Sequence, residues 1–232
     1  MYKINFNNLY FIKEKFTQCN ELNIINKKYT NNPKIVVIAG VHGNEFAPPL
    51  GVEKFLNNNE FIKGNLYFIP RVNKEGLKIK TRGSPCKKEY YDINRNFNAD
   101  NNNYLEKQIL DLIDDADFVL DFHEAYDFHK INKNSIGSTI SPINNQTSIN
   151  MSNYLVEKIN KTITDNNKEF VTLLDKKYDI PNTLQDYCDK KNINYNLIEI
   201  TGQHNKQKLE LRINQTINIL ENFFHFYDII KK

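Results

Sequence analysis

The chain has 232 residues, of which 40% are hydrophobic, and it carries 31 basic residues against 28 acidic ones. This composition is ordinary for a soluble globular protein, and the small basic excess gives no reason to expect binding to nucleic acid or to a membrane. No segment approaches the ~20 apolar residues of a membrane span, and the N-terminus lacks the continuous apolar run of a signal peptide. The sequence therefore predicts a cytoplasmic protein.

Short apolar runs that indicate strands alternate along the chain with segments whose apolar residues have helical spacing. In chain order we expect a strand at 35–39, a helix at 45–56, a strand at 65–69, a helix at 104–113, strands at 118–122 and 135–140, a helix at 148–163, a strand at 170–173, a helix at 183–190, a strand at 195–200 and a helix at 206–230. The strands are β-branched and nearly continuous in apolar residues, which suits a sheet that is covered on both faces. This pattern indicates an α/β three-layer sandwich with a mixed, mostly parallel central sheet. No break demands a second domain.

The three cysteines, Cys19, Cys86 and Cys188, form no CxxC pair. An odd number of cysteines without that spacing argues against a disulfide framework and fits a reducing compartment. We expect each cysteine to be a small filler of the core rather than a nucleophile.

Reactive side chains stand at the ends of three predicted strands. His42 follows the strand that ends at residue 39, His123 follows the strand that ends at residue 122, and Glu199 lies near the end of the strand 195–200. In open α/β sheets, ligands bind in the crevice at the carboxyl ends of the strands. The sequence therefore predicts that these side chains meet at one edge of the sheet.

Segment 40–45 (GVHGNE) contains a candidate metal-binding pair. His42 and Glu45 are three positions apart, so one turn can direct both side chains at one point. Two imidazoles and one carboxylate form the ligand set of hydrolytic zinc sites, and His123 would supply the second imidazole. The alternative interpretation is a helix start that Asn44 caps, with Glu45 favourable to the helix dipole.

Segment 121–124 (DFHE) admits a similar alternative, in which His123 only bonds to the backbone at a strand end. Its acidic residues, Asp121 and Glu124, are expected to be solvated or bonded locally at the turn. His129 lies in a loop-like stretch and is not expected to bind metal.

Glu199 lies between two isoleucines in segment 196–202 (NLIEITG). A carboxylate is costly to bury there without a partner, and burial raises a carboxylate's pKa toward neutral, which suits a general base. The alternative is a strand whose other face is solvated, and this segment alone does not decide between them.

Segment 91–97 (YDINRNF) offers groups that could bind a substrate. Arg95 presents a planar fork for a carboxylate, and Asn94 adds a directional donor. The ordinary interpretation is a polar loop, and the same holds for Arg82 in segment 81–84.

In this order, four stretches resemble the zinc carboxypeptidases and their relatives, the succinylglutamate desuccinylase and aspartoacylase family. The stretches are HGNE at 42–45, DINRNF at 92–97, DFH at 121–123 and LIE at 197–199. The resemblance spans about residues 35–202 and implies the zinc carboxypeptidase-like fold. It also implies one Zn²⁺ per chain, held by His42, Glu45 and His123.

The same resemblance implies roles for the remaining residues. Glu199 would be the catalytic base that later returns its proton to the leaving amine, and Arg82 would stabilise the oxyanion. Asn94 and Arg95 would bind the substrate carboxylate. Tyr178 matches in position the loop tyrosine that the peptidases bring over the substrate, and Asp92 resembles the carboxylate that orients a zinc histidine, here His42.

The resemblance implies hydrolysis of an amide bond next to a free carboxylate, in a small molecule or a short peptide. An N-acyl amino acid deacylase is the first interpretation, and a metallocarboxypeptidase or murein-peptide amidase is the alternative. A function of another class is a non-catalytic ligand-binding domain on the same fold. Larger aspartoacylase relatives have a C-terminal β domain, whereas only one helix is expected after Gly202, so we expect residues 1–232 to form a single catalytic domain.

Overall fold

The computed structural model describes residues 21–86, 91–98, 103–175 and 179–231. Its strands are β1 (Ile25–Lys28), β2 (Lys34–Ala39), β3 (Asn65–Ile69), β4 (Phe118–Ala125), β5 (Thr139–Pro142), β6 (Val171–Thr172) and β7 (Tyr195–Thr201). Its α-helices are α2 (Ala47–Asn58), α3 (Lys74–Ile79), α4 (Tyr104–Ile113), α5 (Gln146–Asn160), α6 (Leu184–Lys191) and α7 (Leu209–Phe226). Short 3₁₀ turns occur at Ile93–Arg95, Asn166–Lys168 and Gln203–Asn205.

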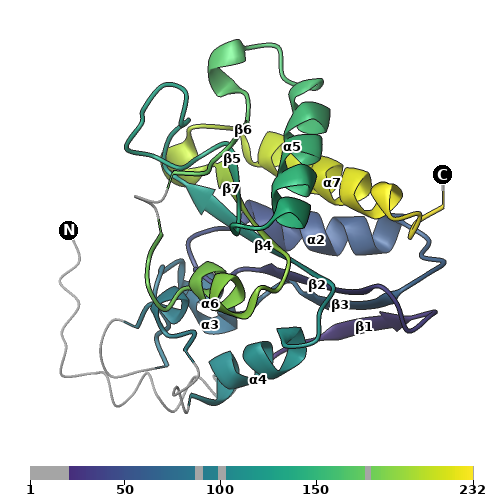
Figure 1. Ribbon diagram of the computed structural model, residues 1–232. Coiled ribbons are helices and arrows are strands. Elements are labelled where there is room, and N and C mark those ends of the chain that lie inside the picture. Colours follow the sequence, from purple (N-terminus) through teal and green to yellow (C-terminus); the bar gives the residue numbers. More distant parts are fainter. Residues whose placement is uncertain (1–20, 87–90, 99–102, 176–178, 232) are drawn as a thin grey trace, which may run out of the picture.

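The strands form a mixed sheet in the order β1-β3-β2-β4-β7-β5-β6. The pairs β2–β3, β2–β4, β4–β7 and β5–β6 are parallel, whereas β1–β3 and β5–β7 are antiparallel. Helices α2, α5 and α7 cover one face of the sheet, and α3, α4 and α6 lie on the other (Figure 1). The predicted three-layer sandwich with a mostly parallel sheet is therefore confirmed.

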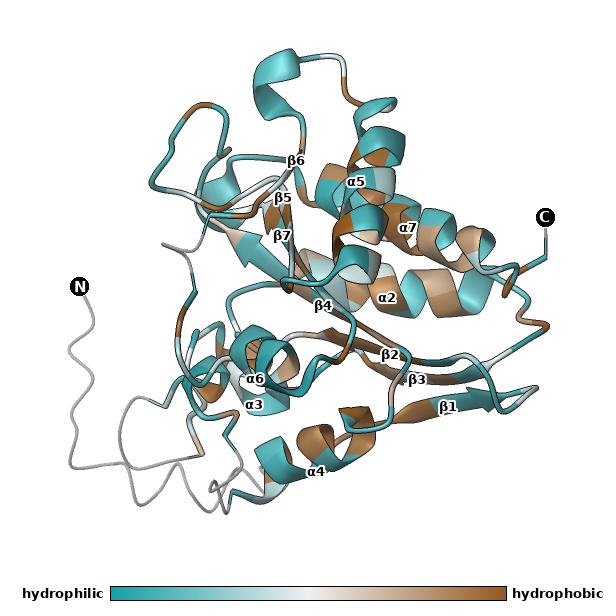
Figure 2. Cartoon of the chain, viewed as in Figure 1, coloured by the Kyte–Doolittle hydropathy of each residue, from teal (hydrophilic) through white to brown (hydrophobic). Residues whose placement is uncertain are grey.

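Both faces of the central strands are buried, which explains their continuous apolar runs. Val37 of β2 packs in a cluster with Phe55 of α2 and Phe223 of α7, whereas its neighbour Val36 packs with Ile109 of α4 on the other face. Successive residues of a strand point to opposite faces, so a strand covered on both sides needs no polar alternation. Figure 2 shows the apolar residues gathered on the central strands and on the helix sides that face them. Among the described residues, no helix combines the length and the apolar character needed to cross a bilayer.

Some elements differ from the sequence prediction. β1 and α3 were not predicted, because the sequence of β1 (INKK) has no apolar periodicity and α3 is only 6 residues long. β5 was expected at 135–140 but covers Thr139–Pro142. β4 continues past Phe122 to Ala125, because its pairing with β7 continues through those residues.

The cysteines also differ in part from the prediction. Cys188 is free and buried, as expected of a core filler, whereas Cys86 is disulfide-bonded. The expectation of unpaired cysteines is therefore wrong for Cys86, because cysteine spacing in the sequence does not show which cysteines pair. Cys19 lies outside the described residues.

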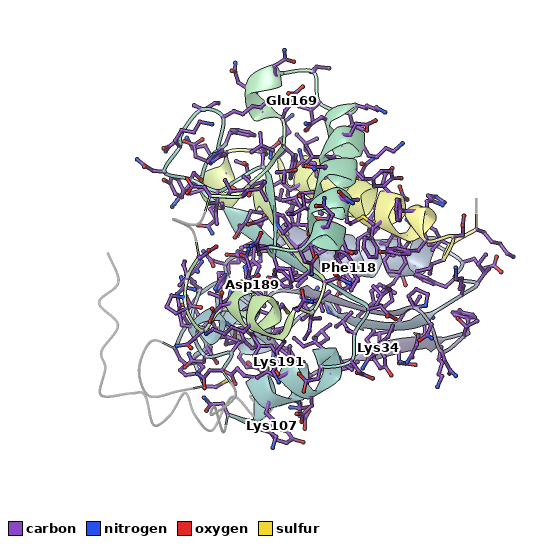
Figure 3. All side chains as sticks on the ribbon, viewed as in Figure 1. Lys34, Lys107, Phe118, Glu169, Asp189 and Lys191 are labelled. Carbon is purple, nitrogen blue, oxygen red and sulfur yellow. The ribbon has the colours of Figure 1, made fainter. Side chains whose placement is uncertain are left out.

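The parallel strands β2, β4 and β7 all end at the same edge of the sheet. Lys34 and Phe118 mark the amino ends of β2 and β4 (Figure 3). Because β2, β4 and β7 run in the same direction, their carboxyl ends meet at the opposite edge. The segments that carry the candidate reactive residues begin or end there.

Candidate metal centre

The turn after β2 carries the first two candidate ligands. Gly40 has a left-handed backbone with φ of 67°, which lets the chain turn sharply at the end of the strand. Gly43 lies against α3, where an added Cβ would stand 2.1 Å from the carbonyl carbon of Gly76. This close approach fixes the turn, in which His42 and Glu45 are only 2% and 1% exposed.

Glu45 does not act as a helix-dipole residue. α2 begins at Ala47, and no side chain caps its start, so the alternative role for Asn44 is also absent. The Glu45 carboxylate instead lies between two imidazoles. Its Oε1 is 2.8 Å from Nδ1 of His42, and its Oε2 is 3.0 Å from Nδ1 of His123.

His123 comes to the same point from β4. It lies within the strand rather than after it, because the β4–β7 ladder continues to the pair Ala125 and Thr201. In that ladder His123 is directly paired with Glu199, and paired residues direct their side chains to the same face. The structure thus brings His42, Glu45, His123 and Glu199 to one edge of the sheet, as the sequence predicted.

The donor atoms fit a single metal ion. Those of His42, Glu45 and His123 lie within 4.8 Å of one another, and the two Nδ1 atoms are 3.0 Å apart. Tetrahedral zinc, with bonds of about 2.0–2.1 Å, places its ligand atoms roughly 3.3 Å apart. Two imidazole nitrogens and one carboxylate are also the ligand set of hydrolytic zinc sites, which leave a fourth position open.

Asp92 holds the outer side of His42. Its Oδ1 is 3.0 Å from Nε2 of His42, and its Oδ2 accepts a hydrogen bond from Nε of Arg82 at 3.3 Å. Burial alone would raise the pKa of Asp92, but the hydrogen bond and charge of His42, together with two nearby arginines, hold that pKa well below its usual range. Asp92 therefore stays ionised beside the imidazole, where a carboxylate fixes ring orientation.

Both candidate arginines reach the site. Arg82 donates from Nη1 to Oε1 of Glu45 at 3.3 Å, and its side chain is 34% exposed. Arg95 is 38% exposed and donates from Nη1 to the carbonyl oxygen of Asn94 at 2.6 Å. Asn94 is buried, and its Oδ1 accepts the Leu184 N–H at the start of α6 at 3.0 Å. Its Nδ2 amide is therefore the part that could donate to a substrate.

Glu199 is only 7% exposed beside these residues. Burial is the main cause that raises the pKa of Glu199 to about 8, and the negative charges of Glu45 and Asp121 act in the same direction. The positive charges of His123 and Arg82 oppose the shift without cancelling it. A carboxylate of raised pKa is basic enough to accept a proton from water near neutral pH.

Comparison with known families agrees with this geometry. The succinylglutamate desuccinylase/aspartoacylase catalytic domain matches residues 31–147, which is half of the chain. The chain belongs to this family. A search of curated protein sequences finds no significant match.

Solved structures share the fold of this family member. The apo cell shape determinant protein Csd4 from Helicobacter pylori has a TM-score of 0.78 at 19% identity, with 91% of this chain and 56% of Csd4 covered. The mDAP-bound form of Csd4, named a D,L-carboxypeptidase, has a TM-score of 0.75 at 19% identity, with 90% and 55% covered. A protein from Shewanella amazonensis SB2B, provisionally named a metallopeptidase, has a TM-score of 0.68 at 16% identity, with 95% and 91% covered. The chain thus spans just over half the length of Csd4.

Two acidic residues of β4 differ from expectation. Asp121 and Glu124 are both buried, so the prediction that they are solvated or locally bonded is wrong. Asp121 accepts a hydrogen bond from the Tyr195 hydroxyl of β7 at 2.9 Å, and Glu124 pairs with Arg212 of α7 at 2.5 Å. Glu124 lies in the interior because β4 is longer than predicted, and Asp121 lies there because both faces of β4 are covered. Their partners are distant in sequence, so no local pattern could have indicated them.

One residue that was not predicted lies in the site, and two residues named from the sequence lie outside it or outside the described residues. Gln203, which was not predicted to be part of the site, donates from Nε2 to Oε1 of Glu45 at 3.3 Å. His129 lies outside the cluster of His42, Glu45 and His123, and its Nδ1 is 2.7 Å from the carbonyl oxygen of Ser135. Tyr178 lies outside the described residues, so its role stays a prediction.

A pocket of about 220 Å³ lies between β5, α6 and residues 173–175 and 179–180. Ser141 of β5 lines it, and Thr139, on the same side of β5, is directly paired with Glu199. The pocket therefore lies on the sheet face that carries Glu199. Its acidic lining residues are Asp175, Asp179, Asp186 and Asp189, the last of which is labelled on α6 in Figure 3.

Proposed function

We propose that the chain is a zinc-dependent hydrolase that cleaves an amide bond next to a free carboxylate. The observation that carries the proposal is the Glu45 carboxylate between two inward-facing Nδ1 atoms, with buried Glu199 paired to one of those histidines across the sheet. One Zn²⁺ per chain would be held by His42, Glu45 and His123. When bound, zinc supplies a Lewis acid that lowers the pKa of a water ligand and polarises the scissile carbonyl.

Side chains of the protein would transfer the proton of the attacking water and stabilise the negative charge that develops on the substrate. Glu199 would accept a proton from the attacking water and deliver it to the leaving amine nitrogen, which its burial and raised pKa support. Arg82, one third exposed beside Glu45, is placed to face negative charge that develops on the carbonyl oxygen. Arg95 and Asn94 would bind the carboxylate that the substrate already carries, so they should act mainly on specificity and positioning.

An N-acyl amino acid is the substrate class we propose first. Membership of the succinylglutamate desuccinylase/aspartoacylase family supports it, since both names denote cleavage of an acyl group from an amino acid. In this assignment the amino acid carboxylate would meet Arg95, and the scissile amide would lie between the metal ligands and Glu199. We also propose that residues 1–232 act as one catalytic domain.

A short peptide is the second candidate substrate. Its support is the likeness to Csd4, which is named a D,L-carboxypeptidase and has been solved with a tripeptide and with mDAP. A carboxypeptidase and a deacylase would use the same metal and base. They would differ in whether a peptide or an acyl group lies next to the scissile amide bond.

The first test is the metal content of the purified protein. The proposal expects about one zinc per chain, retained in His225→Ala and lost in both His42→Ala and His123→Ala. His225 on α7 is a suitable control because it is not part of the metal cluster. No bound zinc, with no uptake when zinc is supplied, would refute the hydrolase and leave a ligand-binding domain as the better account.

The second test separates the substrate classes. N-acyl amino acids and short peptides would be assayed with free and with amidated C-termini, and Glu199→Gln would control for contaminating hydrolases. Turnover of acyl amino acids alone supports the deacylase, and turnover of peptides alone supports the carboxypeptidase. Equal rates on free and amidated substrates would contradict the requirement for a free carboxylate.

A further inference from the structure

The second metal histidine has a buried carboxylate behind it. Asp121 Oδ1 lies 3.2 Å from Nε2 of His123, the nitrogen that faces away from the metal cluster. Among the described residues neither atom makes an aligned hydrogen bond, so each is the nearest polar partner available to the other in a close contact of opposite charge type. The other oxygen, Oδ2, accepts the Tyr195 hydroxyl at 2.9 Å. Asp121 and Tyr195 are 0% exposed and His123 is 1% exposed, so bulk solvent does not reach this arrangement.

The arrangement determines which nitrogen of His123 can bind a metal. A carboxylate only accepts hydrogen bonds, and a neutral imidazole carries one N–H. With Asp121 behind the ring, that N–H belongs at Nε2, which leaves the lone pair of Nδ1 directed at Glu45 and His42. Metal-binding histidines commonly donate their second N–H to a carboxylate, which fixes the tautomer and raises the basicity of the ligand.

Asp121 differs from Asp92, the carboxylate behind His42. Asp92 is 13% exposed in its side chain and also pairs with Arg82, so part of its charge is offset by a cation. Asp121 is fully buried, and among its described neighbours a phenol hydroxyl takes the place of an arginine. A carboxylate buried without a cation is costly unless its partners use its charge. His123 bound to a metal would be such a partner.

We propose that Asp121, held in place by Tyr195, is a positioning residue that sets the tautomer and orientation of His123 for metal binding. This inference rests on the metal centre of the proposed function, and it concerns affinity for the metal rather than the hydrolytic step. The competing explanation is that Asp121 and Tyr195 only form a buried hydrogen bond that stabilises the sheet.

Two variants separate these explanations. Asp121→Asn keeps the shape of the side chain and removes its charge, and Tyr195→Phe removes only the hydroxyl that holds Asp121. Tyr187→Phe is the matched control, because the Tyr187 hydroxyl also donates to an aspartate, Asp114, at 2.6 Å but lies away from the metal cluster. Zinc affinity would be measured by competition with a chromophoric chelator. The thermal stability of the metal-free proteins would be measured separately.

We expect Asp121→Asn to weaken zinc binding by about 10–100-fold. Tyr195→Phe should weaken it by about 2–10-fold, because one buried hydrogen bond is lost. Tyr187→Phe should leave it unchanged. The visible spectrum of the Co²⁺-loaded protein should change in Asp121→Asn, because the geometry around the ion depends on the orientation of His123. A structural role alone would lower stability and leave both affinity and spectrum unchanged.

The inference is overturned if folded Asp121→Asn binds zinc as tightly as the wild type. If Asp121→Asn does not fold, unchanged zinc affinity in folded Tyr195→Phe overturns it instead. Wild-type protein that binds zinc but hydrolyses no acyl amino acid or peptide would refute the proposed function and leave the inference standing. Wild-type protein that binds no zinc would refute both.

Discussion

The sharpest prediction concerns Glu199→Gln in the metal-free protein. Glu199 is nearly fully buried, and its pKa rises from 4.5 to about 8 in the folded state. The unfolded chain releases this proton near pH 4.5, whereas the folded protein retains it until about pH 8. The free energy of unfolding should therefore fall as the pH rises between these values, and the loss should be complete above about pH 8.

The expected magnitude follows from the size of that shift. One pKa unit corresponds to about 1.4 kcal/mol, so at pH 7 the carboxylate should cost the metal-free fold about 3 kcal/mol. The cost at pH 5 should be less than about 1 kcal/mol. Glutamine has nearly the same shape and cannot ionise, so Glu199→Gln should remove this pH dependence. The variant should gain stability over the wild type as the pH rises from 5 to 7.

Urea unfolding in the presence of a chelator, at several pH values from 5 to 8.5, would measure the effect. Glu210→Gln on α7 is a suitable control, because it removes an acidic group that is largely exposed. Parallel stability curves for wild type and Glu199→Gln would refute the argument that burial keeps this carboxyl protonated.

The same variant tests the catalytic role once zinc is present. A bound dication lowers the pKa of a nearby carboxyl, so zinc should reduce the contribution of Glu199 to the pH dependence of stability and leave Glu199 able to accept a proton near neutral pH. Glu199→Gln should retain zinc and lose nearly all turnover. Normal turnover in the variant would remove Glu199 from the mechanism.

Three other changes have defined outcomes. Arg95→Ala should raise KM strongly for substrates with a free carboxylate and little for amidated analogues, and steady-state assays that give equal losses on both would contradict its role. Asp92→Asn should weaken zinc binding by about 10–100-fold, since the carboxylate orients His42, and chelator competition would measure it, with unchanged affinity as the refuting result. Gly43→Ala should destabilise the fold by about 3 kcal/mol in urea unfolding, because the new Cβ would overlap the backbone of Gly76, and a wild-type midpoint would show that the turn can move.

The sequence predicted the parts of the fold that depend on burial. β2, β3 and β7 are covered on both faces, so their apolar runs are continuous and their positions were predicted nearly to the residue. β1 is an edge strand with mostly exposed side chains, so it has no such pattern and was missed. α3 was missed because it depends on tertiary contacts and on Asn73, whose side chain caps the Gly76 N–H.

The meeting of the main site residues could be predicted from the sequence, whereas the buried partners of those residues could not. His42 and Glu45 are close in sequence, and the strand ends at His123 and Glu199 follow from the general rule for open sheets, so their meeting point could be inferred. The buried partners of the site could not be inferred in this way. Asp121 depends on Tyr195, which is 74 positions away in sequence and becomes its neighbour only through the β4–β7 pairing.

The charge balance of the site gives an independent physical reason to expect a metal ion. The buried or half-buried carboxylates gathered there belong to Glu45, Asp92, Asp121 and Glu199. They outnumber the guanidinium groups of Arg82 and Arg95, each of which is partly exposed and therefore screened by solvent. Burial is the main cause of the raised pKa of Glu199, and the negative charges of Glu45 and Asp121 add to it.

A divalent cation between the two imidazoles would remove that excess without moving any side chain far. It would lower the cost of burying Asp121 behind His123, and it would allow Glu199 to ionise where a proton acceptor is needed. Because the unfolded chain cannot assemble these ligands, the binding free energy would add directly to the stability of the fold. Metal binding, stability and the state of the catalytic base should therefore change together, and zinc should remove the loss of stability that ionisation of Glu199 causes in the metal-free protein as the pH rises.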